Sequence, residues 1–295
     1  MTNYRAEHDP AAALWRLYAG DVRLLEYAYG DPDDPCPGFR SVRTPSGVEM
    51  TMYRPWDHVW HVGLFFTWKY IDGLNFWEGA YEEKKNRSYS VRFEPLNGGS
   101  GRGAGFRQTI EYRCWEGIAR IREERTCRIV PAPNGYRIDY DAVHENVAPR
   151  ALLLDRTPHT EQTPWGGYAG YSFRFARNFL NPAITTPNGT TTAEAMFGER
   201  VPWCDYSGKV DGERDRWAGV TLLDAADNPR FPTNVSTYDY KDLQFMNAAF
   251  LFDAPYEMAA GERLRLRYSF YVHDGAGTIE AGEREWESFQ AALQV

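Results

Sequence analysis

The segment that most constrains this chain is 263–272, where every second residue is apolar and the residues between them, up to Ser269, are Arg or Ser. Successive side chains of a β-strand point to opposite faces, so strict alternation indicates a strand with one buried face and one solvated face. The apolar face comprises Leu264, Leu266, Tyr268, Phe270 and Val272. His273-Asp274-Gly275 follows directly, so we expect this strand to carry a histidine and a carboxylate at its end.

The same period recurs in two further segments. In 106–114 one face carries Phe106, Gln108, Ile110, Tyr112 and Cys114. In 136–141 the residues Tyr136, Ile138 and Tyr140 alternate with polar ones, and the preceding Pro-Ala-Pro-Asn-Gly at 131–135 is a turn signal. The second segment therefore predicts one strand of a hairpin whose other strand lies before the turn.

Helical period is confined to the two ends of the chain. Trp286, Phe289 and Leu293 share one helical face, and 11–18 predicts a short opening helix. Stretches 95–105 and 181–190 contain Gly and Pro, and they predict surface loops. Strands without alternating helices favour an all-β antiparallel sandwich with short terminal helices over a parallel α/β sheet.

Length and composition favour a single all-β domain over residues 1–295. The 295 residues are 43% hydrophobic and 15% aromatic, enough for one large core. Sandwiches commonly exceed two hundred residues as one domain, and no change of composition marks a linker.

Charge and hydropathy exclude several classes of partner. The formal net charge of -8 argues against nucleic acid and against anionic membrane surfaces, both of which attract clustered Lys and Arg. No stretch approaches the roughly 20 apolar residues that span a bilayer. The first residues contain no apolar core of a secretory signal, and the four scattered cysteines form no pairing pattern. We expect a cytoplasmic protein with reduced thiols.

The densest group of chemically versatile residues is 54–61, which holds Arg54, Asp57, His58 and His61. Pro55 disfavours helix, so we expect a loop that enters a strand near 64–68. Histidine takes or gives a proton near neutral pH, and a neighbouring carboxylate fixes its tautomer. The segment therefore predicts acid–base chemistry. The alternative is a structural role, in which both imidazoles hydrogen-bond the loop backbone.

A metal site is a second interpretation of the same two histidines. Distant side chains would have to complete the ligand shell, and the candidates are His144, Glu145, His159 and Glu161. His-x-x-His outside a helix, without the glutamate of a zinc-protease motif, is weakly diagnostic. A divalent metal therefore remains an open alternative.

Aromatic residues crowd around the histidine segment and recur further along the chain. Sugars stack on the flat faces of Trp and Tyr, while Asp and Arg hydrogen-bond their hydroxyls. The alternative is that most of these rings belong to the core. The substrate-binding candidates are Trp56, Trp60, Trp68, Trp165, Tyr168, Arg174 and Asp205, with Phe76, Trp77 and Trp203 as further aromatic neighbours.

Several short motifs occur in a characteristic order. They are Arg43-Thr44-Pro45-Ser46-Gly47, Arg54-Pro55-Trp56-Asp57-His58, His61-Val62-Gly63-Leu64, Asp72-Gly73-Leu74-Asn75-Phe76-Trp77, Gly166-Gly167-Tyr168, Asp205-Tyr206-Ser207-Gly208, Gly219-Val220, Asn228-Pro229-Arg230 and His273-Asp274-Gly275. In this order, over about residues 20–280, the chain resembles a bacterial family of unassigned function that is usually labelled methane oxygenase PmoA-like. A membrane methane monooxygenase subunit needs spanning helices, so no methane chemistry follows.

The resemblance implies a soluble β-sandwich akin to the supersandwich of sugar mutarotases, often encoded near oxidoreductases that act on sugars. The family pattern has a further histidine and an arginine after His58, whereas here Trp60 and Val62 flank His61. This departure argues against a site built from several histidines around a metal.

Together, these patterns predict a carbohydrate-acting enzyme. It would be a mutarotase-like epimerase, or a lyase or hydrolase for an oxidised sugar or glycoside that a partner oxidoreductase supplies. His58 or His61 would be the general base, Asp57 would orient it, and His273 or Arg54 would be the acid or electrophile. The alternatives are a non-catalytic carbohydrate-binding module that uses the same aromatic residues and a structural partner of a sugar oxidoreductase.

Overall fold

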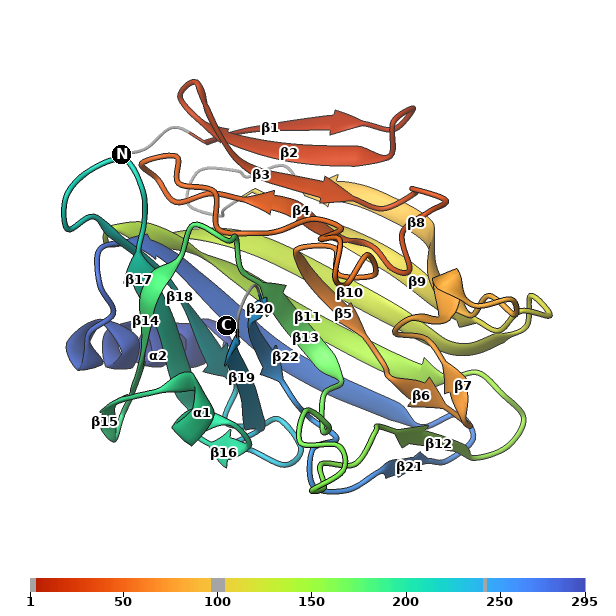
Figure 1. The fold of residues 1–295 in the computed structure, drawn as a ribbon. Helices are drawn as coiled ribbons and strands as arrows, with labels where there is room; N and C mark the ends of the chain where they lie inside the picture. Colours follow the sequence, from red (N-terminus) through yellow and green to blue (C-terminus); the bar gives the residue numbers. More distant parts are fainter. Residues whose placement is uncertain (1–3, 97–103, 241–242, 295) are drawn as a thin grey trace.

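The structure is a computed structural model that describes residues 4–96, 104–240 and 243–294. Almost all of its regular structure is antiparallel β (Figure 1). The described residues form two nine-stranded sheets, which face each other, and one four-stranded sheet. The predicted all-β sandwich with few helices is therefore confirmed.

The sheets and helices have the following bounds, with strands given in spatial order. Sheet A comprises β1 (Tyr4–Asp9), β2 (Leu14–Ala19), β3 (Val22–Ala28), β4 (Gly38–Val42), β5 (Leu64–Thr67), β13 (Gly170–Arg174), β20 (Leu243–Ala248), β19 (Asn234–Tyr240) and β16 (Glu199–Arg200). Sheet B comprises β15 (Gly189–Thr191), β14 (Leu180–Thr186), β17 (Trp203–Lys209), β18 (Trp217–Asp224), β22 (Arg263–Asp274), β11 (Gly135–Asn146), β10 (Ala119–Ala132), β9 (Gly105–Arg113) and β8 (Arg87–Leu96). Sheet C comprises β21 (Tyr256–Met258), β12 (Leu152–Asp155), β6 (Tyr70–Ile71) and β7 (Leu74–Asn75). The helices are α1 (Ala193–Met196), α2 (Ile279–Ala292) and the 3-10 turn η1 (Gly79–Tyr81).

The three segments with period-two alternation form strands as predicted. The apolar face of β22 lies in the main core between sheets A and B, as does that of β9. The hairpin predicted around 131–135 joins β10 to β11, although both strands extend into the turn signal and leave only Pro133 and Asn134 between them. Asn134 adopts a positive φ of 57°, which asparagine tolerates in tight turns.

Two of the predicted elements are wrong. Residues 11–18 contain strand β2 instead of a helix, because Trp15 and Leu17 are both buried at period two. Residues 181–190 form most of the hairpin β14–β15 instead of a loop. Of the loop predicted at 95–105, residues 97–103 lie outside the described residues.

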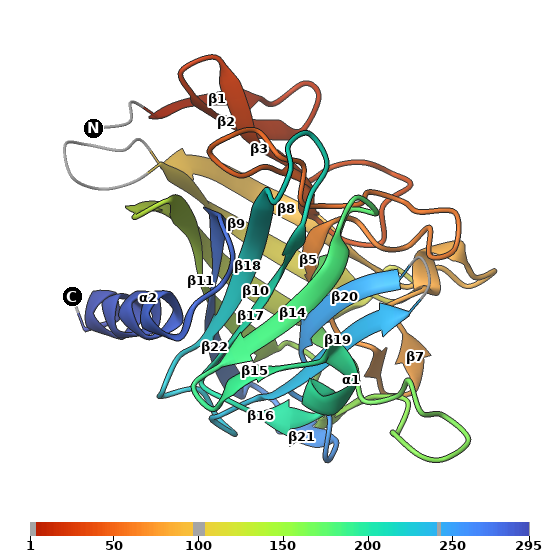
Figure 2. The same cartoon turned by 60° about the vertical axis from the view of Figure 1, so that its left-hand side comes forward.

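The predicted C-terminal helix is confirmed as α2. Thr278 caps it by accepting a hydrogen bond from the Ala281 amide, and Phe289 is fully buried against sheet B. Figure 2 shows α2 lying along the outer face of this sheet. Within the described ranges, neither helix has the length and apolarity that crossing a membrane requires. All four cysteines are buried and unpaired.

The pleat of the strands separates three apolar layers. On β5, Leu64 and Phe66 point into the main core, whereas Phe65 points to the outer face of sheet A. On β22, Phe270 points into the core and Tyr271 points outward beneath α2. One outer face is thus covered by a helix and the other by loops, and these loops surround the candidate site.

The main core also encloses a polar network. The Arg125 guanidinium donates to Glu123 at 2.5 Å, and the Tyr112 hydroxyl donates to the same carboxylate at 2.7 Å. His144 lies 3.8 Å from Glu123, and its ring is packed between Phe66 and Trp68. Burial lowers the pKa of His144 to about 4, although the neighbouring Glu123 carboxylate acts to raise it. His144 is therefore neutral at pH 7.

Stability should therefore fall in mild acid. The unfolded chain takes up the proton of His144 below about pH 6.5, whereas the folded chain takes it up only near pH 4. Between these pH values the buried neutral ring costs up to about 3 kcal/mol of unfolding free energy. Urea denaturation at a series of pH values measures this loss.

His144→Phe isolates the contribution of this ring, because neither ring nitrogen has a hydrogen-bond partner among the described residues. Between pH 6.5 and pH 4 the unfolding free energy of the variant should fall less steeply with pH than that of the wild type. The difference between the two slopes should correspond to the uptake of about one proton on unfolding. An unchanged pH dependence would contradict the assignment of a neutral His144.

Candidate functional site

A cavity of about 640 Å³ opens on the outer face of sheet A. It falls within the range of roughly 300–1,000 Å³ that small-molecule sites occupy. Its lining is aromatic with few polar groups and consists of His58, Trp60, His61, Trp77, Glu78, Pro164, Trp165, Tyr168, Tyr238, Tyr240, Leu243 and Phe245.

The floor of this cavity comes from the hairpin β19–β20. Tyr238 is paired with Phe245 across the two strands, and Tyr240 is paired with Leu243. Directly opposed residues share one face of a sheet, so all four side chains project from the outer face of sheet A. The walls come from three segments outside the sheet: 54–61, 77–78 and 164–168.

The segment 54–61 forms a closed loop that brings the two histidines together. The Arg54 amide donates to the His61 carbonyl at 2.9 Å, and the His61 amide donates to the His58 carbonyl at 2.9 Å. The two imidazole rings stack with centroids 4.8 Å apart. Gly63 then turns the chain into β5 with φ of 83°, where a Cβ would lie 2.1 Å from the Phe39 carbonyl oxygen.

Asp57 binds three partners behind His58. Its carboxylate lies 2.9 Å from His58 Nδ1 and accepts hydrogen bonds from Arg174 at 2.7 Å and Arg177 at 2.9 Å. Burial opposes ionisation of this carboxyl, but the bonds to His58 and Arg174 outweigh it and lower its pKa to about 2. An ionised carboxylate can only accept, so His58 Nδ1 carries a proton and donates it to Asp57. Nε2 is then the nitrogen left for a ligand in the cavity that His58 lines.

His61 occupies the deeper position of the two histidines. It is 4% exposed, and its ring stacks on Phe245 with the ring centroids 5.1 Å apart. Burial lowers its pKa well below the ordinary value, and the neighbouring His58 and Arg174 add to that effect. The ring is therefore neutral at pH 7, and its Nδ1 has no hydrogen-bond partner among the described residues.

A second polar group lies in the same cavity. Glu78 lines it, forms an ion pair with Lys69, and accepts a 3.4 Å hydrogen bond from the Tyr168 hydroxyl. Lys69 is 4% exposed and lies 5.2 Å from the centre of the Tyr168 ring. The cavity thus combines two imidazoles and a carboxylate with an otherwise mainly aromatic lining.

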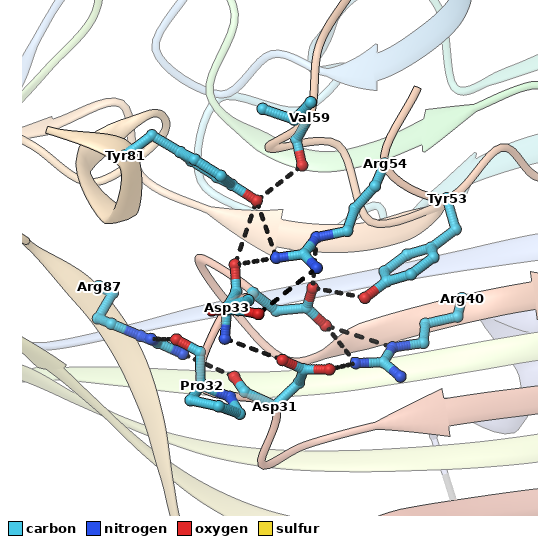
Figure 3. Close-up of polar contacts among 10 residues, drawn as sticks. Asp31, Pro32, Asp33, Arg40, Tyr53, Arg54, Val59, Tyr81 and Arg87 are labelled. Atoms are coloured by element: carbon cyan, nitrogen blue, oxygen red, sulfur yellow. Dashed lines mark hydrogen bonds and ion pairs between the residues drawn. The ribbon is translucent and has the colours of Figure 1, made fainter. Parts of the chain in front are cut away.

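Arg54 lies at the base of the histidine loop and does not line the cavity. Figure 3 shows its guanidinium together with the Tyr81 hydroxyl, next to the backbone of Asp33 and Val59. Arg54 donates to the Asp33 carbonyl at 2.5 Å and to Tyr81 at 3.1 Å, and Tyr81 lies 3.0 Å from the Val59 carbonyl oxygen. The structure therefore gives Arg54 a role in holding the loop, in place of the predicted role as an acid or electrophile.

His273 and Asp205 lie on the opposite side of the sandwich. Val272 points into the main core, so the next residue, His273, projects from the outer face of sheet B. There its Nε2 lies 2.8 Å from Asp205 Oδ2, which also accepts from Thr221. The core separates this pair from the cavity on sheet A, so neither residue joins the site predicted for it.

Two of the predicted stacking residues also lie elsewhere. Trp68 is fully buried in the main core, because it shares the inward face of the chain with Leu64 and Phe66. Trp56 is 75% exposed and lies over Arg177, outside the cavity. Of the other candidates, Trp60, Trp165 and Tyr168 line the cavity, and Arg174 lies behind it against Asp57.

The metal shell considered for His58 and His61 does not form. His144 lies in the main core between the sheets, and His159 packs on Phe197 and Phe252 outside the cavity. Throughout the described ranges, no three or more His, Cys, Asp or Glu side chains are grouped so that they could hold a metal ion.

Several lining or supporting residues escaped the sequence analysis. Glu78 directly follows the Asp72–Trp77 motif, which could have drawn attention to it. Tyr238 and Tyr240 are separated by one residue, a period-two signal for a shared strand face. Lys69 and Phe245 carry no local signal, because only the pairing of distant segments brings them here.

The chain belongs to a family of unknown function (DUF6807), whose model matches residues 15–287. The description of that family does not contain the PmoA-like label. No curated protein matches the sequence.

Solved structures give only distant similarities. The galactosidase domain of an alpha-galactosidase-sucrose kinase, AgaSK, has a TM-score of 0.48 and 11% identity, over 92% of this chain and 42% of that one. A TPR-domain containing protein from Parabacteroides distasonis has a TM-score of 0.45 and 10% identity, over 91% and 48%. An alpha-galactosidase from Lactobacillus brevis has a TM-score of 0.40 and 8% identity, over 99% and 41%. The chain spans less than half of each of these structures, and similarity this low assigns it no activity.

The two arginines that bind Asp57 should contribute unequally to stability. Arg174 is fully buried whereas Arg177 is 34% exposed, so only the first bond is shielded from water. Arg174→Met should lower the unfolding free energy by about 3 kcal/mol, because it leaves the Asp57 carboxylate without its buried counter-charge. Arg177→Met, the matched control, should cost less than about 1 kcal/mol. Urea denaturation at pH 7 compares them, and equal losses would contradict this ranking.

Proposed function

We propose that this protein is a carbohydrate-acting enzyme in which His58 exchanges a proton with a sugar bound in the cavity on sheet A. The observation that carries the proposal is the arrangement of His58. Its Nδ1 is held by an ionised Asp57, and the ring lines an aromatic cavity of about 640 Å³.

The His58–Asp57 pair has the geometry of a general base and its orienting carboxylate. Asp57 fixes the tautomer in which Nε2 has a free lone pair, and it stabilises the imidazolium that forms when Nε2 accepts a proton. Arg174 donates to the same carboxylate oxygen that lies next to His58, Oδ2, and Arg177 donates to Oδ1, so the carboxylate is held at both oxygens. His61 stacks on His58, and burial together with the neighbouring His58 and Arg174 keeps His61 neutral by lowering its pKa.

The lining of the cavity suits a sugar. A pyranose has apolar faces that stack on indole and phenol rings, and hydroxyls at its edge that need hydrogen-bond partners. Trp60 and Tyr168 supply aromatic rings, while His58 and Glu78 supply polar partners. A purely apolar ligand would leave these two polar groups desolvated and unpaired, at a cost of about 1–3 kcal/mol each.

The reaction class that fits best is proton abstraction from a sugar. In a mutarotase-like reaction the proton leaves the anomeric hydroxyl. In an epimerase, or in a lyase acting on an oxidised sugar, it leaves a carbon made acidic by an adjacent carbonyl group. In each case His58 Nε2 accepts the proton and returns it to the product or to solvent. The resemblance to a family encoded near sugar oxidoreductases supports an oxidised substrate that a partner enzyme supplies.

His58→Ala should lower turnover by at least about 100-fold, which is the usual contribution of a positioned acid–base group. Because the ring is partly exposed and makes one hydrogen bond, the same change should cost about 1 kcal/mol of stability or less. Proton NMR in D₂O on sugars and 3-oxo glycosides measures turnover as anomeric exchange, deuterium uptake at carbon, or release of a product.

His159→Ala is the matched control, since His159 is exposed and does not line the cavity. It should retain wild-type turnover. Saccharide binding without turnover in the wild type would favour the alternative of a binding module. A His58→Ala variant that melts several degrees lower yet retains full turnover would show that His58 is structural.

A further inference from the structure

The cavity is larger than the space next to the side chains of His58 and Glu78. Its outer part is lined by Pro164, Trp165, Tyr240 and Leu243, and none of these side chains is acidic or basic. A volume of about 640 Å³ lies well inside the range of cavities that hold drug-sized ligands, which are larger than a single hexose. One sugar ring placed against His58 would leave the outer part of the cavity filled with water.

Trp165 is a large apolar side chain that is 49% exposed at this outer part. The loop that carries Trp165 is held in place by backbone hydrogen bonds. The Trp165 carbonyl accepts a 2.8 Å hydrogen bond from Tyr238 on β19, and the Gly167 amide donates to the Thr157 carbonyl at 2.7 Å. These bonds hold the Trp165 backbone against sheet A.

The two glycines after Trp165 allow this close packing. A Cβ at Gly166 would lie 2.3 Å from the Pro158 carbonyl oxygen, and one at Gly167 would lie 2.3 Å from the Phe252 ring. Gly167 also has a φ of 97°, which other residues rarely adopt. The backbone beside Trp165 is thus fixed while its indole remains half exposed. A rigid, exposed ring at the edge of a ligand cavity is a preorganised stacking surface.

We infer that the outer part of the cavity is a second sugar subsite, in which Trp165 stacks on the ring next to the one that reacts. The physiological ligand is then a glycoside of two or more sugar rings. This inference rests on the proposed carbohydrate function and adds the size of the substrate. Tyr168, with ring centroid 6.2 Å from Trp165, lies between the two subsites and contacts both rings.

The experiment compares ligands of increasing length by isothermal titration calorimetry on the full chain. The probes are glucose, galactose and mannose, a disaccharide and trisaccharide of each, and the corresponding p-nitrophenyl glycosides. For the sugar series that binds, the disaccharide should bind up to about 10-fold more tightly than the monosaccharide, since one aromatic stacking contact is worth up to about 1.5 kcal/mol.

Trp165→Ala tests the residue itself. The variant should reduce disaccharide affinity about 10-fold and change monosaccharide affinity by less than about 2-fold. The matched control is Trp115→Ala, because Trp115 has nearly the same exposure, 48%, but lies over Lys84 outside the cavity. It should leave both affinities unchanged.

The remaining outcomes would contradict either the second subsite or the carbohydrate function. Equal affinity for monosaccharide and disaccharide, or an equal loss of both in Trp165→Ala, overturns the second subsite and leaves the proposed function in place. A p-nitrophenyl glycoside that gains affinity through Trp165 when the disaccharide does not also overturns it, since the occupant is then an aromatic aglycone. If none of these saccharides and none of the 3-oxo glycosides binds, the carbohydrate function fails and the subsite fails with it.

Discussion

The bonds of the Asp57 carboxylate hold the candidate site together. One carboxylate connects the histidine loop to Arg174 at the end of β13 and to Arg177 just beyond it. Because Arg174 is fully buried, its charge needs a fixed partner of opposite sign, and Asp57 provides one. The same carboxylate fixes the tautomer of His58. One group thus supplies both the counter-charge that the buried arginine requires and the orienting partner that the proposed base requires.

The position of this site on the sandwich follows from the alternation of side chains along the strands. Residues of β19 and β20 that point away from the main core form a floor on sheet A, where loops rather than a helix surround them. On sheet B the equivalent outer face packs against α2, so its outward aromatic residues, such as Tyr271 and Trp203, become core. The outer face of sheet A therefore carries an open cavity, whereas α2 covers that of sheet B.

Much of the fold could be predicted from alternation, because a strand with one buried face shows its period locally. The strands β9, β11 and β22 were visible in this way, and so was the amphipathic helix α2. The strand β2 was missed because Trp15 and Leu17 lie in a segment too short to separate a period of two from a helical one. The same alternation could have assigned Trp68 to the core, since every second residue of this segment, Leu64, Phe66 and then Trp68, shares one face.

The site was only partly predictable, for a physical reason. His58 and His61 are close in sequence and meet through local turns, so their convergence could be expected from residue order. Arg174 and Phe245 meet them through the sheet order β5-β13-β20, which depends on pairing between distant segments. His273 illustrates the limit. Alternation indicates that it points away from the apolar face of β22, but not which outer face of the sandwich it will reach.

The polar groups of the cavity suggest what it is built to hold. A buried ion pair such as Lys69–Glu78 contributes little net stability, because desolvation offsets most of the attraction between its charges. The neutral His61 also contributes little to stability, because its buried Nδ1 has no hydrogen-bond partner within the described residues. An all-apolar lining would avoid this desolvation cost, and we propose that the polar groups are retained because a ligand uses them. The proposed sugar would offer hydrogen-bonding groups to His58 and Glu78 and flat apolar faces to the aromatic rings of the lining.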